Sequence, residues 1–346
     1  MTPMIYSDSV YGELTIESSI LLDLMETKAM QRLHGVLQHG VTALIGITQP
    51  TTRFEHSIGV MELVRRLGGG IEEQIAALLH DVSHTAFSHV IDYVFQSHDS
   101  QGYHEEMKEP YIANSDIPAV LERFGYDWHI LLHEEEFSLL ERPAPELCAD
   151  RLDYFLRDSL SLKLASITEV QDALKHLTVY DGRIVVDSMD VARWIGNTFI
   201  AADQASWANF REVGLYELAA IAIRRALKIG VLTEADIWTT DMQAWTRMHS
   251  SDDSELQSAL RVVSPATTFL WDEATPTFRV STKLRTLDPQ ILLEGQAQSL
   301  SKLDEVFTQH QASYLQGKRG KWPMRVIPPG ETSIVRNELH LVNRVS

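Results

Sequence analysis

Cysteine is almost absent from this sequence of 346 residues, since Cys148 is the only one. A single cysteine excludes an intramolecular disulfide, so we expect the chain to reside in a reducing compartment, the cytoplasm. We expect Cys148 itself to be a small core residue rather than a nucleophile. The first residues, MTPMIYSDSVYG, have neither the basic start nor the apolar run of a secretory signal, which agrees with this expectation.

Long hydrophobic runs and positive charge are also scarce. No stretch approaches the roughly 20 apolar residues that a membrane helix needs, so we expect a soluble chain. With 30 basic and 48 acidic residues, the formal net charge is -18, which repels the phosphate backbone of nucleic acids over most of the surface. A small anion stays a candidate ligand, provided that a metal ion and a few arginines reverse the charge in one pocket.

Helical periodicity dominates up to about residue 245, and we interpret residues 1–245 as one mainly α-helical domain. The predicted helices cover residues 55–67, 71–79, 147–160, 191–210 and 212–229. The exception is HLTVYDGRIVVD, residues 176–187, where an Asp181-Gly182 turn between two short apolar runs predicts a β-hairpin.

The pattern changes after Met248, and we interpret residues 246–346 as a smaller α+β lobe. It opens with a polar, linker-like stretch, HSSDDSE. Further on, FRVSTKLRTL (278–287) alternates like a strand, SLSKLDEVFTQHQASYL (299–315) has the periodicity of a helix, and KWPMRVIPP (321–329) predicts another strand.

Histidines gather in two neighbouring stretches, FEHSIGV (54–60) and LLHDVSHTAFSH (78–89). His80 and Asp81 are adjacent at the end of an apolar helix, from which both side chains can reach one metal ion. His56 would approach the same ion if its helix packs antiparallel to that one. A fourth ligand would come from the stretch ELCADRLDYFLRD, which offers Asp150, Asp153 and Asp158.

Two imidazoles and two carboxylates suit Mn, Fe, Co, Ni or Zn, with Mg as a further option. Around a divalent ion such a set is formally neutral, so it can accept a phosphate oxygen and a water molecule. Against this, a lone buried histidine usually satisfies a core hydrogen bond, and an aspartate near a helix end is usually a cap. The complete pattern favours a metal, because burying so many ionisable groups in apolar helices is costly without an ion.

The stretches RFEHSIGV, LLHDVSHTAFSH, YHEE and DRLDYFLRD together resemble the HD-domain metal phosphohydrolases, particularly the deoxynucleoside triphosphate triphosphohydrolase branch. DSVYGELTI, AMQRLHGVLQHG and TKLRTLDPQIL resemble other segments of that branch, so the resemblance covers most of the chain. It implies an HD-type helical bundle that hydrolyses a phosphate ester or anhydride of a small nucleotide-like substrate, and homo-oligomerisation. It also implies one divalent metal ion, with His56, His80, Asp81 and Asp150 as its ligands, and leaves Asp153 a structural role.

The resemblance implies roles for a second set of residues. It places His84 and His89 against the phosphates, while His104 assists attack or leaving-group departure and Glu105 fixes the ring of His104. Histidine titrates in the range that such proton transfer needs. The implied substrate contacts are Arg53, Gln38 at the base, Arg151, Tyr154, and Asp158 at the sugar. Taken alone, Arg151 is nearly as well explained by a surface salt bridge.

One segment departs from the branch. Its usual pattern, R-x-x-V-Y-x-H-K, has a tyrosine that packs on the deoxyribose. The corresponding REVGLYE, residues 211–217, has Gly214 at the tyrosine position and Tyr216-Glu217 in place of His-Lys. A preference for deoxynucleotides is therefore not expected to follow from the resemblance.

Two other hypotheses stay open. In the first, an HD fold holds two metal ions and acts as an oxygenase or phosphodiesterase, with His84, His104 and His129 as conceivable donors to the second ion. In the second, the chain is a non-catalytic nucleotide sensor, which the change at Gly214 motivates. His129 and His133 also have i, i+4 ligand spacing, but no motif surrounds them, so we expect a half-exposed helix there.

Overall fold

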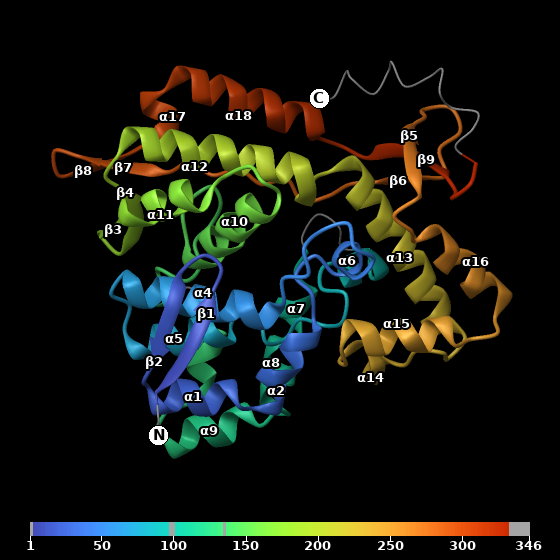
Figure 1. The fold of residues 1–346 in the computed structure, drawn as a ribbon, viewed down its shortest axis with the longest axis horizontal. Helices are drawn as coiled ribbons and strands as arrows, with labels where there is room; N and C mark the ends of the chain where they lie inside the picture. The colour runs from blue at the N-terminus through green and yellow to red at the C-terminus, as the bar shows by residue number, and fades with distance from the viewer. Residues whose placement is uncertain (1–2, 97–100, 134–135, 332–346) are drawn as a thin grey trace.

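Residues 3–96, 101–133 and 136–331 are described by the computed structural model, and their fold is mainly helical with three small sheets (Figure 1). This confirms the predicted fold class, a mainly α structure with a β-hairpin and further strands towards the C-terminus. Within these ranges, no helix has both the length and the apolar character that crossing a bilayer requires.

The first part of the chain contains a hairpin followed mostly by short helices. In chain order the elements are β1 (Met4–Asp8), β2 (Gly12–Ile16), α1 (Ser19–Met25), α2 (Lys28–Arg32), η1 (Leu33–Gly35), α3 (Val41–Leu44), α4 (Arg53–Arg66), α5 (Ile71–Leu79), α6 (Val90–Val94), α7 (Tyr103–Glu106), α8 (Lys108–Ala113), α9 (Ile117–Arg123) and η2 (Trp128–Leu132).

The second part contains longer helices and most of the strands. In chain order these are α10 (Ala149–Ser161), α11 (Ile167–Lys175), β3 (Leu177–Tyr180), β4 (Arg183–Val186), α12 (Met189–Ala202), η4 (Asp203–Trp207), α13 (Phe210–Lys228), α14 (Glu234–Ile237), α15 (Asp241–His249), α16 (Ser254–Val262), β5 (Thr268–Trp271), β6 (Phe278–Val280), β7 (Gln290–Leu293), β8 (Gln296–Ser299), α17 (Leu300–Leu303), α18 (Glu305–Lys318) and β9 (Trp322–Ile327).

Helices α4 and α5 pack against each other and are joined by a short glycine turn. Thr52 starts α4 with a capping box, in which its hydroxyl accepts from the Glu55 N–H and the Glu55 carboxylate accepts from the Thr52 N–H. Gly68, with a φ of 86°, ends the α4 segment. The pair brings the start of α4, with His56, beside the end of α5, with His80, as the sequence predicted.

Helix α10 approaches α4 closely. A Cβ atom on Gly59 would lie 2.0 Å from Asp153 Oδ1 and 2.1 Å from Arg157 Nη2, so a side chain there would displace this buried charge pair or push the two helices apart. The guanidinium of Arg157 donates two hydrogen bonds to Asp153, 2.7 and 3.1 Å long, and pairs with Asp8 at 2.8 Å. The absent side chain at Gly59 therefore allows α10 to place charged groups deep in the core.

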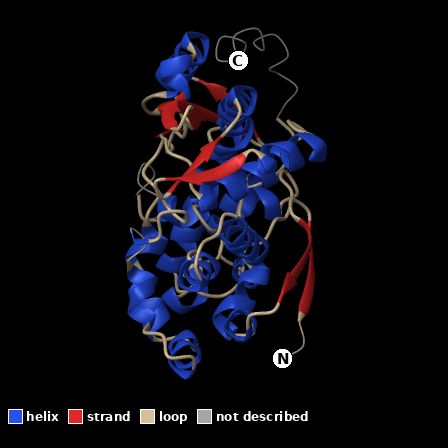
Figure 2. Ribbon diagram, turned by 90° about the vertical axis from the view of Figure 1, so that its left-hand side faces the viewer, coloured by secondary structure: helices blue, strands red, loops and turns tan. Residues whose placement is uncertain are grey.

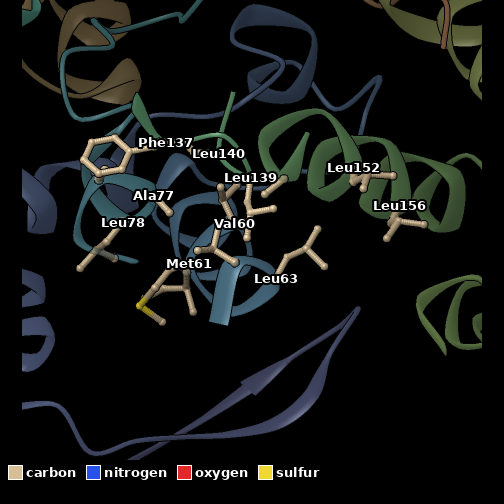
Figure 3. Close-up of a cluster of buried hydrophobic side chains, with 14 of the residues drawn as sticks. Val60, Met61, Leu63, Ala77, Leu78, Phe137, Leu139, Leu140, Leu152 and Leu156 are labelled. Atoms are coloured by element: carbon tan, nitrogen blue, oxygen red, sulfur yellow. The ribbon is translucent and has the colours of Figure 1, made fainter. Parts of the chain in front are cut away.

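Apolar side chains of α4, α5, α10 and the segment 137–140 form much of the main core around these polar groups. The labelled side chains in Figure 3 are Val60, Met61, Leu63, Ala77, Leu78, Phe137, Leu139, Leu140, Leu152 and Leu156. A second core cluster surrounds α6 and α13 and includes side chains of β5, β6 and β9. Because Val82 belongs to the first cluster and Phe87 to the second, the segment between them links the two.

The predicted hairpin at residues 176–187 is confirmed as β3 and β4. Asp181 and Gly182 both have positive φ, 50° and 67°, as a tight hairpin turn requires. Strand β7 pairs in parallel with β4 and carries β8, so this sheet crosses the predicted boundary at residue 245. The division into domains 1–245 and 246–346 stays a prediction. Figure 2 shows the β1–β2 hairpin apart from the other strands.

Three element predictions were wrong in part. The helix predicted for 191–210 ends at Ala202 and is followed by the π turn of η4. The helix predicted for 299–315 is divided at Asp304, because the Asp304 side chain accepts from the Phe307 N–H and starts α18 anew. The strand predicted for 278–287 ends at Val280, and the residues from 281 to 289 follow an irregular path.

Candidate metal centre and active site

The four predicted ligands meet between α4, α5 and α10. His56 Nε2 lies 3.0 Å from Asp150 Oδ1, 3.3 Å from His80 Nε2 and 3.5 Å from Asp81 Oδ2. His80 Nε2 lies 3.5 Å from the same oxygen of Asp81 and 3.5 Å from that of Asp150. His56, His80 and Asp81 are buried. Helix packing thus brings together side chains that are up to 94 residues apart in the chain.

The second nitrogen of each imidazole has a partner that orients the ring. His56 Nδ1–H donates to Asp153 Oδ2 at 2.7 Å, and His80 Nδ1–H donates to the Ala77 carbonyl at 2.8 Å. In the neutral rings both Nε2 atoms therefore present a lone pair to the cluster, the arrangement that metal-ligating histidines use. Asp153, for which a structural role was expected, supports His56 in this way.

Negative charge dominates the cluster. Burial opposes the charged form of His80, yet Asp81 and Asp150 raise its pKa to about 9. Burial also opposes ionisation of Asp150, but hydrogen bonds with His56 and His80 hold the pKa of Asp150 well below its usual range. The carboxylates therefore favour a positive charge at the centre of the cluster.

The donor geometry fits a divalent ion. Metal–ligand bonds of about 2.1 Å at right angles separate neighbouring donors by about 3 Å, close to the distances of 3.0 to 3.5 Å between His56 Nε2 and its neighbours. Ligand atoms of His56, His80 and Asp81 all lie within 4.8 Å of one another. Asp150 supplies the fourth donor, and this mixed nitrogen and oxygen set suits the divalent metals predicted from the sequence.

Arg53, predicted to bind substrate, lies against the same centre. Its Nη1 pairs with Asp81 Oδ2, and its Nε–H donates to Ser88 Oγ at 3.1 Å. The guanidinium is buried, and its remaining N–H groups match the geometry of phosphate oxygens.

His84, His89 and His104 form a second group of imidazoles next to Asp81. The rings of His84 and His104 stack with centroids 3.9 Å apart, and His89 lies edge-on to His84 at 5.0 Å. Burial, followed by the charges of Arg53 and His104, holds the pKa values of His84 and His89 well below the usual range. Neither ring nitrogen of His84 makes a hydrogen bond to any described residue, although Nε2 lies 3.2 Å from Asp81 Oδ1. His84 therefore offers an uncommitted nitrogen to a ligand.

His84 joins this group from a turn rather than from a helix. α5 ends at Leu79, as predicted, and most of the segment 80–89 forms turns. At Phe87 the backbone is left-handed, with a φ of 66°. Asp241 stabilises the segment, because its Oδ1 accepts from the Phe87 N–H at 2.7 Å.

His104 and Glu105 lie in the single turn of α7. Glu105 Oε1 accepts from His104 Nε2–H at 3.0 Å. Burial disfavours the ionised carboxyl, but the hydrogen bond with His104 lowers the pKa of Glu105. This contact leaves His104 Nδ1 to exchange a proton, so the geometry has the form expected of a proton-transfer pair.

Gln38 and Tyr154, both predicted to contact substrate, carry groups that a ligand could use. Gln38 Oε1 is buried without a hydrogen-bond partner among the described residues, and such an orphaned acceptor favours a ligand because leaving it unsatisfied is costly. The ring centroid of Tyr154 lies 6.4 Å from that of His56, and 4.9 Å from that of Trp207 in an edge-on contact.

Arg151 already has protein partners. It donates to Glu141 Oε1 at 2.6 Å and to the carbonyls of Glu146 and Arg142 at 2.7 and 2.8 Å. Its ion pair is the structural alternative that the sequence suggested, and its contact with substrate stays a prediction. Glu141 was not singled out from the sequence; burial, followed by Asp150, raises its pKa to about 7.

Both oxygens of Asp158 are also occupied. Trp207 Nε1–H donates to one at 2.6 Å, and His39 Nε2 lies 2.9 Å from the other. Burial opposes protonation of His39, but Asp158 raises its pKa. The sugar contact expected of Asp158 stays a prediction, and any such contact competes with these two partners. His39 was not predicted from the sequence, where its only signal is its place beside Gln38.

Lys283 and Arg285 near the site were also missed. They lie in the segment after β6, where Arg285 Nη2–H donates to Gln101 Oε1. Their signal was the alternation of basic residues in STKLRTL, which places both side chains on one side of an extended chain. That alternation was interpreted only as a strand pattern.

The departure at Gly214 has a packing reason. A Cβ atom there would lie 2.6 Å from the ring of Phe269, so glycine allows β5 to pack on α13. Tyr216 turns towards the site, where its hydroxyl donates to the His39 carbonyl at 2.9 Å. Glu217 pairs with Arg224 at 2.7 Å.

The remaining candidates lie outside the centre. His129 is exposed in the 3-10 turn η2 and donates to Asp127 at 2.6 Å, and the groups of potential ligands found in the described ranges do not include it. Cys148 is buried, as expected of a small core residue. Glu134 and Glu135, which follow His133, lie outside the described residues.

A cavity of about 700 Å³ lies between α2, α8 and α14, and none of the predicted ligands lines it. Its lining includes Arg32, Tyr111 and Trp238. We locate the candidate site by the chemistry of its donors, because cavity volume alone does not distinguish a crevice from a reaction centre.

Comparison with known proteins links this geometry to a family. Residues 53–158, which carry all four predicted ligands, match the family described as HD domain. The chain is 38% identical to the uncharacterized protein YdhJ of Bacillus subtilis, over 91% of this chain and 97% of that protein. It is 33% identical to cns2 of Cordyceps militaris, described as a metal-dependent phosphohydrolase, over 84% of this chain and 86% of that protein.

A solved structure of a hypothetical protein from Aquifex aeolicus has the same fold, with a TM-score of 0.68 at 19% identity and 99% of each chain covered. The deoxynucleoside triphosphate triphosphohydrolase SAMHD1 homolog of Dictyostelium discoideum is 24% identical over 54% of this chain and 42% of that protein. The similarity to that branch is therefore distant and partial.

Proposed function

The chain belongs to the HD-domain metal-dependent phosphohydrolases, and we propose that it hydrolyses a phosphate ester or anhydride of a small nucleotide-like substrate at the centre formed by His56, His80, Asp81 and Asp150. The observation that carries this proposal is the convergence of two oriented imidazoles and two carboxylates beside a row of further histidines. A single transition-metal ion is our proposal for the occupant.

When bound, a divalent ion in this set polarises a phosphate oxygen and acidifies a coordinated water molecule. The protein groups around it bind and orient the substrate. Arg53 adds a buried positive charge beside Asp81 and stabilises negative phosphate oxygens. His84 and His89 are neutral because burial lowers their pKa values, so their ring nitrogens approach phosphate as hydrogen-bonding dipoles.

His104 is the proposed proton-transfer group. Glu105 accepts from its Nε2–H, which leaves Nδ1 to take a proton from the attacking group or to give one to the leaving group. Gln38, with its orphaned amide oxygen, is proposed to bind the base of the substrate. A triphosphohydrolase reaction on deoxynucleotides is one version of this proposal, supported by the shared motifs alone.

The test combines metal analysis with a phosphate-release screen on one preparation. Purified protein is loaded separately with Mn²⁺, Co²⁺, Ni²⁺, Fe²⁺, Zn²⁺ or Mg²⁺ and offered ribonucleotides, deoxynucleotides and phosphomonoesters. We expect phosphate, pyrophosphate or tripolyphosphate release that depends on added metal and disappears in His104→Ala, while that variant still binds the best substrate. No release from any substrate with any of these metals would contradict the proposal.

A second candidate function has one observation in its favour. Ligand atoms of Asp81, His84 and His104 form another group within 4.8 Å of one another, and this group shares Asp81 with the first. These residues would hold a second ion if one were bound. A dinuclear centre would suit an oxygenase or a phosphodiesterase. Counting the metal separates the two functions, since two ions per chain, with the second lost in His84→Ala, favour this candidate over the first.

A further inference from the structure

Resting on the proposed phosphohydrolase function, we propose that Lys283 and Arg285 bind phosphate oxygens of the substrate outside the metal's coordination sphere, and that Asp203 positions Arg285 for this contact. Both cations lie in the irregular segment that follows β6. In this proposal, the segment 281–289 lines the active site and does more than connect two strands.

The segment is held in place from both sides. Tyr93 of α6 donates its hydroxyl to Thr282 Oγ1 at 3.2 Å, and Gln311 of α18 donates to the Leu287 carbonyl at 3.1 Å. Thr282 and Leu287 are buried, whereas Lys283 is exposed. Anchored ends and an outward charge are the features expected of a binding segment built on a rigid scaffold.

Arg285 is placed by neutral and backbone groups. Its Nη2–H donates to Gln101 Oε1, its Nη1–H donates to the Lys283 carbonyl at 3.1 Å, and its backbone N–H lies 3.5 Å from Asp203 Oδ2. In residues 3–96, 101–133 and 136–331, no carboxylate lies within 4.0 Å of a side-chain nitrogen of Lys283 or Arg285. The charges of both residues are therefore available to an anion.

The other arginines near the centre are committed to carboxylates. Arg53 pairs with Asp81, Arg151 with Glu141, and Arg157 with Asp153. In a chain with a net charge of -18, two neighbouring cations without a carboxylate partner mark a local reversal of charge. Phosphate oxygens are the anions that such a position fits in a phosphohydrolase.

Two contacts connect Arg285 with the site. Gln101, its partner, precedes His104 by three residues. Asp203 opens the π turn that ends at Trp207, whose ring packs on Tyr154. The charge of Arg285 also acts on the pKa values of His89 and Tyr154, where burial is the largest cause of the shift. Through Gln101, Arg285 is therefore connected to the segment that carries His104.

Lys283 is linked to Arg285 by geometry, because its carbonyl accepts from Arg285 Nη1–H at 3.1 Å. The charges of Arg285 and Arg151 act on its amine, and so do those of Glu141 and of the predicted ligand Asp150. A phosphate group bound near the metal would relieve the repulsion between these cations.

Asp203 is the positioning residue. It is fully buried, its Oδ2 accepts from the Tyr314 hydroxyl at 2.6 Å, and its Oδ1 has no hydrogen-bond partner among the described residues. A buried carboxylate with an orphaned oxygen is costly. A π turn, a feature often found at functional sites, holds it against the backbone of Arg285.

The first experiment measures binding without turnover. Inorganic tripolyphosphate is titrated calorimetrically into the full-length protein with its bound metal. We expect Arg285→Gln and Lys283→Gln each to weaken binding roughly tenfold, and Arg285→Lys to weaken it less, because the charge is kept but the planar fork is lost. Arg279→Gln is the matched control, since Arg279 precedes the segment on β6 and pairs with Glu273 at 3.1 Å; its Kd should stay within about twofold of the wild-type value.

The second experiment separates positioning from folding. With the best substrate of the screen, Arg285→Gln should raise KM roughly tenfold and leave kcat within about threefold. Asp203→Asn should raise KM in the wild-type background but add nothing in the Arg285→Gln background, because it acts through that side chain. A merely structural role for Asp203 would give additive effects.

The outcomes distinguish this inference from the proposed function. If the wild-type protein binds no tripolyphosphate, or if Arg285→Gln and Lys283→Gln bind it as tightly as Arg279→Gln does, the inference is overturned even when phosphate is released. If the two variants lose binding but no substrate is hydrolysed, the anion site stands and the proposed function fails. Should Arg285→Gln not fold, Lys283→Gln decides the matter, because its position is exposed.

Discussion

The four predicted metal ligands come from the ends of α4, α5 and α10, which share one hydrophobic cluster, whereas several of the groups around the proposed substrate come from turns, short helices and irregular segments. We call the first set, with His56, His80, Asp81 and Asp150, the metal half. The second, in residues 84–96, 101–105, 203–207 and 281–287, is the substrate half. Rigid packed helices hold charged donors a few ångströms apart, while irregular segments bring cations from distant parts of the chain.

The largest effect should come from Asp81→Asn in the metal half. The amide removes a charge that faces His56 and His80 at 3.5 Å and pairs with Arg53. We expect most bound metal to be lost and phosphate release to fall about 1000-fold, since the metal supplies several kcal/mol of transition-state stabilisation. Elemental analysis and phosphate release check this, with Asp127→Asn, at an exposed position, as the matched control. An unchanged metal content would break the assignment of Asp81 as a ligand.

The next largest effect tests whether the metal half depends on the closeness of α4 and α10. Gly59→Ala puts a Cβ atom 2.0 Å from Asp153 Oδ1, so we expect the free energy of unfolding to fall by about 3 kcal/mol. Gly317→Ala is the control, because Gly317 lies in α18 with nothing within 4 Å of its Cβ position. That change should raise the stability by roughly 0.5–1 kcal/mol. If Gly59→Ala and Gly317→Ala unfold in urea with equal free energies, α4 and α10 accommodate the added methyl group at little cost.

A smaller effect is expected from Asp153→Asn, which touches no substrate. Its carboxylate accepts from His56 Nδ1–H at 2.7 Å and from Arg157, so the change should weaken metal affinity roughly 10- to 100-fold. Competition with a chelator measures this affinity. At saturating metal, kcat should return close to the wild-type value, and a kcat that stays low would mean that Asp153 acts directly in the reaction.

The smallest effect concerns the link between the halves. Asp241 accepts from the Phe87 and Leu37 N–H groups at 2.7 and 2.9 Å, and burial raises its pKa to about 7. Because the folded-state pKa lies above that of the unfolded chain, this carboxyl stabilises the fold at low pH, and the contribution is lost as the pH rises from about 4 to about 7. The measured quantity is the free energy of unfolding in urea of the wild type minus that of Asp241→Asn. This difference should be smaller at pH 7.5 than at pH 5 by roughly 1 kcal/mol or more. A difference that grows with pH would contradict the raised pKa.

The metal half was accessible from the sequence because its signals are local. His80 and Asp81 follow an apolar helix, and a short turn between two amphipathic helices forces them towards His56. Spacing alone left three carboxylates open for the fourth position. The structure puts Asp150 beside the imidazoles and Asp153 behind His56, in the arrangement that the family resemblance implied.

The substrate half was accessible only in part. The His104–Glu105 pair was proposed from the family resemblance, and its adjacency in sequence alone did not indicate a function. The irregular path of residues 281–289 could not be predicted, because an alternating pattern indicates a strand. Tertiary contacts replace the strand pairing there, and one of them is the contact of Asp203 with the backbone N–H of Arg285. The π turn at 203–207 has no sequence signal comparable to a cap, so the helix was predicted to continue.

By itself, the sequence determined the fold class, the hairpin at 176–187 and the set of side chains able to bind a metal ion, because periodicity, turn residues and donor types act over a few neighbouring positions. Only the tertiary structure decided which basic groups are neutralised and which face the site. Arg151 is paired within the loop that precedes its own helix, whereas Arg285 meets Gln101 across 184 residues. Pairing of charges depends on which distant segments share a buried volume, and no local pattern carries that information.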